Sequence, residues 1–343
     1  MKTSDFVFDL PEELIAQVPS PERSSSRLLV FDRKSGSISH HVFRDISKFI
    51  PAGDLLVLNR SKVIPARMFT ITNPPAAPSE VFFIQKLDGN TFSAMVRPGK
   101  KFKPASIHKF PENKSLFVHE IMPDGLRVLS IENEPDPLSF FRKHGEMPFP
   151  PYITSREAPT ERYQTVYAGE EGSVAAPTAG LHFDEPLLQQ LHNNGVHIGN
   201  VVLHVGIGTF KPVECENIKD HKMHHEDYFI PEELADTYRR VTTAKGKVWA
   251  CGTTSARTLE SVVKLEDDVR TLKSVYGSTD IFITPGYKFK AIDHLITNFH
   301  LPGSTLIMLV AAFAGLKATL EIYRIAVEMK YRFYSFGDAM LIL

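Results

Sequence analysis

The chain has 343 residues, of which 43% are hydrophobic and 23% charged, as is ordinary for a soluble globular protein. Its 39 lysines and arginines nearly balance 40 aspartates and glutamates, so no global basic field indicates a nucleic-acid partner, although a local patch is enough to bind phosphate. Cys215 and Cys251 form no CxxC motif, which argues against a disulfide framework or a cysteine zinc site.

The N-terminal segment carries acidic residues early and has no apolar core of the kind that a signal peptide requires. The longest apolar run, residues 306–316, is too short to cross a bilayer. We therefore expect a cytoplasmic protein with no membrane contact. Its length is enough for about two domains.

The first predicted elements are short. Residues 12–17 (EELIAQ), directly after Pro11, have the pattern of a short helix with acidic residues in its first turn. Residues 53–59 (GDLLVLN) predict a compact strand. Residues 63–69 (VIPARMF) predict an edge or bent strand, because Pro65 has no N–H to donate to a neighbouring strand.

From about residue 70 to residue 132 the sequence consists of β-rich runs without a helical period. Asp88-Gly89 and Asp124-Gly125 each separate two such runs, which predicts two hairpins. We therefore predict a small all-β, barrel-like domain over residues 67–149, inserted into a larger domain.

After residue 150 helical and strand patterns alternate. Asp184 and Gly195 are placed as the N-cap and the C′ residue of one helix, and Ser304 as the N-cap of another. Residues 1–66 and 150–343 are expected to form a large mixed α/β catalytic domain. Its predicted helices lie at 184–195, 231–246, 252–263, 305–315 and from 316 onward, and its strands at 196–205, 247–251 and 280–283.

The predicted strands at 196–205, 247–251 and 294–297 each end in a loop rich in glycine and small polar residues. Ligands of open α/β sheets bind beyond the carboxyl ends of strands, and a helix N-terminus offers free N–H groups to a carboxylate or phosphate. Two plainer interpretations stay open: the Gly-x-Gly-Thr loop is only a tight turn, and Arg257 pairs with Glu260 on its own helix. The expected substrate-binding residues are Gly206, Gly208, Thr209, Phe210, Thr253, Thr254, Arg257, Asn298 and Phe299.

Histidines suggest a rival interpretation. His221 and His224 are three residues apart and precede His225 and Glu226, so two imidazoles can share one helical face. With His182 or His204 they would make a histidine-ligated metal hydrolase, although there is no HExxH motif. A second alternative is a non-enzymatic RNA-binding scaffold that uses the β-rich domain.

Residues 97–104 (RPGKKFKP) gather cations beside an aromatic residue at a predicted hairpin end. Such a run is either a solvated loop or a track for an RNA backbone. The predicted phosphate contacts are Lys100, Lys101, Lys103 and Lys62.

Segments along the whole chain resemble one family, the S-adenosylmethionine:tRNA ribosyltransferase-isomerases of queuosine biosynthesis. They occur in order and include FDLPEELIAQ, GDLLVLN, VIPAR, VRPGK, RYQTVYA, GSVAAPTAGLHF, VVLHVGIGTFKPV, HKMH, GTTSARTLES, DIFITPGYKF, LITNFHLPGSTLIMLV and YRFYSFGDAMLI. Where the family usually reads Asn-Asn-Thr-Arg before VIPAR, this chain has Asn59-Arg60-Ser61-Lys62, so Lys62 keeps the cation.

The resemblance implies a large α/β domain with an inserted β-barrel, and no metal. It implies that the ribosyl group of S-adenosylmethionine, as co-substrate, moves to 7-aminomethyl-7-deazaguanine at the tRNA wobble position. Epoxyqueuosine forms, and adenine and methionine leave. The partner would be a tRNA carrying the precursor base in its anticodon loop, a single strand from which a base can be splayed into a pocket. No obligate protein partner is implied.

This reaction needs at least two groups that handle protons. A base must remove an acidic C5′ hydrogen beside the sulfonium, and the incoming ammonium must lose a proton before it attacks. Arg257 suits the methionine carboxylate, and Phe210 or Phe299 a stacked base. The glycines of the 206–208 loop let the backbone approach the substrate, and His204 is expected to point toward the reacting sugar. The catalytic candidates, among which the base is left open, are His182, His204, His221, His224, His300, Glu260 and Asp338.

Overall fold

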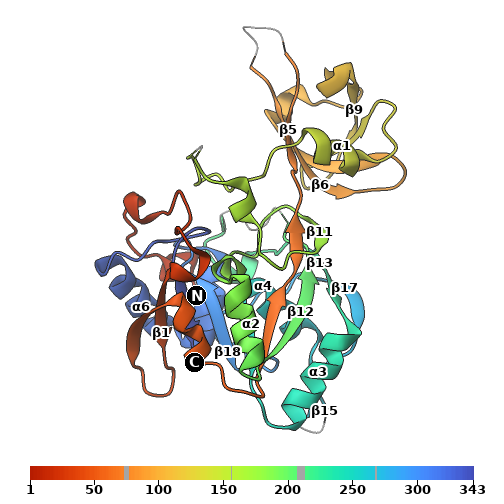
Figure 1. Cartoon of the computed structure of the whole chain (residues 1–343). Helices are drawn as coiled ribbons and strands as arrows, with labels where there is room; N and C mark the ends of the chain where they lie inside the picture. The colour runs from red at the N-terminus through yellow and green to blue at the C-terminus, as the bar shows by residue number, and fades with distance from the viewer. Residues whose placement is uncertain (73–76, 156, 207–212, 267–268) are drawn as a thin grey trace. The chain divides into compact units, whose positions relative to one another are not determined.

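The computed structural model of the chain describes residues 1–72, 77–155, 157–206, 213–266 and 269–343 (Figure 1). Its contacts divide the chain into two compact units. The first comprises Met1–Lys62, Pro150–Glu170 and Ala176–Leu343, and the second comprises Val63–Phe149 and Glu171–Ala175.

The first unit is built on a mixed sheet that has nine strands among the described residues, in the order β17-β13-β12-β3-β14-β18-β19-β1-β2. Strands β12, β3, β14 and β18 are neighbours and run parallel, so their carboxyl ends lie at one edge. Strand β19 runs antiparallel to β18, and β1 parallel to β19, so the amino ends of β19 and β1 lie at that same edge. The strands are β1 (Arg27–Phe31), β2 (Ile38–Val42), β3 (Leu55–Asn59), β12 (His197–Leu203), β13 (Glu226–Ile230), β14 (Val248–Cys251), β17 (Val275–Thr279), β18 (His294–Asn298) and β19 (Ala339–Ile342).

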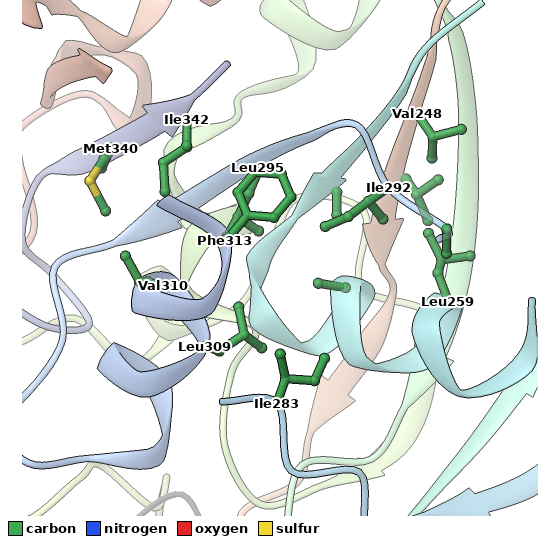
Figure 2. Close-up of a cluster of buried hydrophobic side chains, with 14 of the residues drawn as sticks. Val248, Leu259, Ile283, Ile292, Leu295, Leu309, Val310, Phe313, Met340 and Ile342 are labelled. Carbon is green, nitrogen blue, oxygen red and sulfur yellow. The ribbon is translucent and has the colours of Figure 1, made fainter. Parts of the chain in front are cut away.

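Hydrophobic side chains alternate along the central strands and fill cores on both faces of the sheet. On β3, Leu55 and Val57 belong to one buried cluster, and Leu56 and Leu58 to the other. Figure 2 shows part of the first cluster, which includes Leu295 of β18 and the helical residue Phe313. Helices α3 (Glu232–Thr243), α4 (Gly252–Val262), α5 (Thr305–Ala314) and α6 (Leu316–Glu328) cover this face, and α2 (Glu185–Asn193) covers the other.

The second unit holds an antiparallel sheet in the order β5-β6-β7-β10-β9-β8. The sheet curls, because the backbone N–H of Ile71, just beyond one edge strand, donates to the carbonyl of Lys109 in the other at 2.9 Å. Its strands are β5 (Arg67–Phe69), β6 (Glu80–Lys86), β7 (Thr91–Arg97), β8 (Ile107–Lys109), β9 (Ser115–Ile121) and β10 (Arg127–Ile131), followed by α1 (Pro137–His144).

The remaining elements are short. Strands β4 (Ser61–Val63) and β11 (Glu170–Ser173) pair with each other, as do β15 (Lys264–Glu266) and β16 (Val269–Thr271). The 3₁₀ helices described here are Thr3–Phe6, Glu12–Leu14, Arg23–Ser25 (η3), Phe43–Lys48 (η4), Gly99–Lys101 (η5), Pro111–Asn113, Thr160–Tyr163 (η7), Thr178–His182 (η8) and Ile218–Asp220.

The mixed α/β class expected from the sequence is confirmed, as are both hairpins and the two predicted N-caps. Asp184 accepts a hydrogen bond from the N–H of Leu187 at 2.9 Å, and Ser304 accepts one from Ile307 at 3.3 Å. That the curled sheet is an inserted, barrel-like domain stays a prediction.

Three expectations were wrong. The helix predicted over 12–17 is a single turn, because Ile15 instead forms a β-bridge with Phe333. Residues 280–283 form no strand, since the strand there ends at Thr279. The region 67–149, predicted to be all-β, also contains helix α1, whose start is marked by Pro137 at its first position.

No single helix among the described residues is both long and apolar enough to cross a membrane. Helices α5 and α6 pass that test only as a pair, which is bent by 114° at the break between them.

Candidate functional site at the carboxyl edge of the sheet

The sequence-predicted substrate loops meet at the carboxyl edge of the first unit's sheet. Val201 of β12 lies opposite Asn59 of β3, and Cys251 of β14 lies opposite Ile296 of β18. The segments that continue these parallel strands therefore leave the same edge side by side. Of the predicted residues, this edge gathers His204, Gly206, Thr253, Thr254, Asn298 and His300.

Asn59 organises this edge, a role that sequence reasoning missed. Its amide nitrogen donates to the carbonyl of Leu203 at 3.0 Å, and its amide oxygen accepts from the N–H groups of Leu203 and Ser61, both at 3.1 Å. The fully buried side chain thus fixes the end of β12 against the end of β3. This sets the starting point of the segment that carries His204.

His182 reaches the edge from the turn η8. Its Nε2 lies 3.1 Å from the side-chain amide nitrogen of Asn298, which also donates to the carbonyl of Tyr334 at 3.0 Å. An amide nitrogen only donates, so Nε2 accepts, and Nδ1 carries the proton toward the hydroxyl of Ser26 at 2.7 Å. Burial, followed by the charges of Arg332 and Arg23, lowers the pKa of His182 to about 3. The imidazole is therefore neutral at pH 7 and has both nitrogens engaged.

His300, just beyond β18, is neutral for the same reason. Burial lowers its pKa to about 3. Its Nε2 lies 2.7 Å from the hydroxyl of Thr297, and its backbone N–H donates to the hydroxyl of Tyr323 at 3.0 Å. These contacts fix the ring at the edge.

His204 differs from these two histidines. Its backbone N–H donates to the carbonyl of Asp227 at 3.0 Å, but the buried ring atom Nδ1 has no partner in the described structure. Burial lowers the pKa of His204, while Asp227 and Glu170 act in the opposite sense. A neutral imidazole with an unused nitrogen is suited to accept a proton.

Arg257 of α4 pairs with Glu226, not with Glu260 as the plainer interpretation held. The buried guanidinium nitrogen Nη1 lies 2.5 Å from the Glu226 carboxylate, whose other oxygen accepts the N–H of Gly206 at 3.1 Å. The second guanidinium nitrogen, Nη2, is buried without a partner in the described structure. One cation–anion pair therefore ties the first turns of α4 to the loop after β12 and keeps a donor unused.

Five polar atoms at this edge, two of them described above, are buried without a hydrogen-bond partner among the described residues. They are Thr254 Oγ1, Ser255 Oγ, Asn298 Oδ1, Arg257 Nη2 and His204 Nδ1. Native proteins satisfy nearly all buried polar groups, and each exception requires an explanation. A polar ligand at the strand ends supplies one.

Three predicted site residues are engaged in contacts within the protein. The Glu260 carboxylate accepts from the hydroxyl of Tyr287 at 3.0 Å and from the backbone N–H of Ala291 at 2.9 Å, so it holds a loop. Asp338 accepts from the backbone of Arg27 at 3.0 Å and of Arg332 at 2.8 Å. Phe299 is fully buried, and its ring packs against Tyr323, Tyr331 and Phe333, so it presents no surface for stacking.

His221 and His224 precede β13 and stay partly exposed, and the ring of His221 packs edge-on against Phe282. Burial and His224 lower the pKa of His221. Within the described ranges, no group of three or more His, Cys, Asp or Glu side chains is arranged to hold a metal ion. The arrangement required for the metal-hydrolase alternative is thus missing from the part that the structure describes.

Other predicted contacts lie elsewhere. Lys100, Lys101 and Lys103 are exposed in and beside η5 of the second unit, whereas Lys62 is half-buried in β4. Gly208, Thr209 and Phe210 lie outside the described residues.

Comparison with known proteins identifies the family of the chain. Residues 3–342 match the sequence model of a family described as queuosine biosynthesis protein. The chain belongs to the queuosine biosynthesis protein family.

Relatives in this family are similar over their full lengths. The S-adenosylmethionine:tRNA ribosyltransferase-isomerases of Thermosipho africanus and Thermotoga maritima are each 48% identical to the chain, with 100% of both chains covered. The crystal structure of S-adenosylmethionine tRNA ribosyltransferase from Thermotoga maritima matches 99% of this chain and 100% of its own, with a TM-score of 0.57 and 38% sequence identity. These queuosine biosynthesis relatives support neither the metal hydrolase nor the non-enzymatic scaffold.

Proposed function

We propose that this chain is an S-adenosylmethionine:tRNA ribosyltransferase-isomerase whose active site is the carboxyl edge of the large sheet. The ribosyl group of S-adenosylmethionine moves to 7-aminomethyl-7-deazaguanine at the tRNA wobble position, giving epoxyqueuosine, adenine and methionine. Relatives that are 48% identical over their full length carry the name of this activity. The observation that carries the location is the group of buried, unpartnered polar atoms at the strand ends.

The Arg257–Glu226 pair is our choice for the methionine part of S-adenosylmethionine. The methionine part of S-adenosylmethionine carries an ammonium and a carboxylate on the same carbon. The buried pair offers a carboxylate for that ammonium and a guanidinium for that carboxylate. The carboxylate would accept from the unpartnered Nη2 of Arg257, and the ammonium would donate to Glu226. Thr254, with its unpartnered hydroxyl, would bind a ribose hydroxyl on the same helix turn.

His204 is our choice for the general base that removes a C5′ proton beside the sulfonium. Its Nδ1 is unpartnered, and its lowered pKa keeps the ring neutral at physiological pH. His182 would instead hold Ser26 and Asn298 in place as a neutral ring, because both of its nitrogens already have protein partners. His300, whose Nε2 contacts Thr297, would position the end of β18 as a neutral ring. Gly206, whose N–H is held by Glu226, would let the backbone pass close to the sugar.

The tRNA would reach this edge from the cytoplasm, where tRNA is modified. The exposed lysines Lys100, Lys101 and Lys103 remain our candidates for backbone phosphates, together with Lys62. The β-rich insert over residues 67–149 would then serve as an RNA-binding domain. Replacing the three exposed lysines by glutamine should flatten the salt dependence of tRNA binding, and an unchanged slope would count against them.

One assay tests the function itself. The unaltered protein is mixed with S-adenosylmethionine and tRNA that carries the aminomethyl-deazaguanine base. We expect free adenine and methionine in equal amounts and a heavier anticodon nucleoside. Adenine release without a change in the RNA, or no release at all, would reject the proposed reaction.

A further inference from the structure

A small pocket lies beside the proposed active site within the first unit. It is lined by Arg23 of η3, Arg162 of η7, Ser26 and His182, together with the turn formed by Ser335, Phe336 and Gly337. Its volume is about 20 Å³, which is room for one water-sized group and not for a base or a sugar. Because His182 also contacts Asn298, this pocket adjoins the end of β18.

Two guanidinium groups in this pocket are held rigidly by backbone carbonyls. Arg23 donates to Gln164 at 2.8 Å and to Leu181 at 3.2 Å, and Arg162 donates to Ser20 at 2.8 Å and to Pro21 at 3.0 Å. These bonds fix the direction of each planar group without neutralising its charge. Burial and the neighbouring Arg162 lower the pKa of Arg23, as expected where like charges are held close together.

The pocket holds more positive than negative charge. No carboxylate among the described residues lies within 4 Å of the guanidinium nitrogens of Arg23 or Arg162, and Asp184 acts on Arg23 only from farther away. Arg332 donates to the hydroxyl of Ser20, and its one carboxylate, Asp338, is 3.5 Å away and already accepts two backbone N–H groups. The Nε atom of Arg162 is buried without a partner in the described structure.

From this geometry we infer that the Arg23–Arg162 pocket binds a backbone phosphate of the tRNA, next to the nucleotide that is modified. A phosphodiester oxygen fits the volume, carries only negative charge and accepts from guanidinium groups with a fixed fork geometry. S-adenosylmethionine does not fit, because its sulfonium and ammonium together outweigh its carboxylate and would be repelled. The inference rests on the proposed function and adds the anchor that holds the RNA beside His182 and Asn298.

The test measures binding of an anticodon stem-loop RNA to the full chain at several salt concentrations. We expect Arg162→Gln to weaken RNA binding about ten-fold and to reduce the slope of log K against log salt by about 0.7, the value for one phosphate contact on a single strand. Affinity for S-adenosylmethionine should stay unchanged. Arg324→Gln is the matched control, because Arg324 lies exposed on α6 in surface ion pairs and carries the same charge.

A second measurement begins with the unaltered protein, and this first part does not depend on how the variant folds. Single linkages of the stem-loop are replaced in turn by uncharged methylphosphonates. One linkage beside the modified base should weaken binding about ten-fold, and that loss should vanish in Arg162→Gln.

Loss of S-adenosylmethionine affinity in Arg162→Gln, with RNA binding unchanged, would overturn the inference in favour of the co-substrate carboxylate. Equal sensitivity of Arg162→Gln and Arg324→Gln, or no sensitive linkage near the modified base, would overturn it as well. Adenine release by the unaltered protein tests the proposed function separately, so the two failures are distinguishable.

Discussion

His182 and Asn298 are joined by a hydrogen bond in which the side-chain amide of Asn298 donates to Nε2 of the ring at 3.1 Å. The same amide donates to the carbonyl of Tyr334, so a single side chain connects η8, β18 and the turn before β19. Three segments of the chain therefore meet at the side chain of Asn298, beside a neutral imidazole. The neutrality of that ring has a consequence for stability.

Stability should fall as the pH drops below about 6.5. The pKa values of His182 and His300 are about 3 in the folded protein, below the ordinary 6.5, so the unfolded chain binds more protons between these limits. Each histidine should lower the free energy of unfolding by up to about 1.4 kcal/mol for each pH unit below that upper limit. Urea unfolding at pH 7 and pH 5 measures the effect, and His182→Gln should show a shallower pH dependence. An unchanged slope in that variant would show that His182 titrates normally.

His204→Gln should abolish most turnover without unfolding the protein. The proposed base is lost, and removal of a general base costs about 10²- to 10⁴-fold in rate. His197→Gln is the matched control, since His197 lies exposed at the start of β12, the strand that leads to His204. In the unaltered protein kcat/KM should rise with pH on the acid side, with a midpoint below 6.5, because the base must be unprotonated. Full turnover in His204→Gln would exclude the role.

Features that depend on neighbouring residues could be predicted from the sequence. Contacts between residues far apart in the sequence could not. Asp184 and Ser304 were found as N-caps because a cap depends on its next three residues. The plainer interpretation matched Arg257 with Glu260 on its own helix, yet the structure pairs it with Glu226, 31 residues away. Nothing local marks that partner, since it depends on β13 returning antiparallel to β12.

Asn59 was missed for a similar reason. It reads as the last residue of a strand, and its function appears only when Leu203, 144 residues away, lies beside it. Phe299, Glu260 and Asp338 were expected at the ligand because they occur in motif-rich segments. Such segments also contain residues that hold loops in place, as the backbone N–H groups bound by Glu260 illustrate.

Arg257→Gln should lower both stability and affinity for S-adenosylmethionine. It leaves Glu226 as a buried, unpaired charge, which costs about 3–5 kcal/mol in the free energy of unfolding. Adding Glu226→Gln removes that charge and should recover part of the stability, measured by urea unfolding. Binding of S-adenosylmethionine should stay weak in the double variant. If the double variant binds it normally, the ion pair is only structural.

Glu260→Ala should destabilise the protein by about 3 kcal/mol, because the N–H groups of Ala291 and Ile292 and the hydroxyl of Tyr287 lose their acceptor. Glu260→Gln keeps one acceptor oxygen and should cost about 1–2 kcal/mol. Both variants, compared at equal folded concentration, should retain turnover, since the carboxylate holds a loop and touches no substrate in our proposal. Thermal unfolding and adenine release are the two measurements. A Glu260→Gln protein with normal stability and no turnover would return Glu260 to the catalytic candidates.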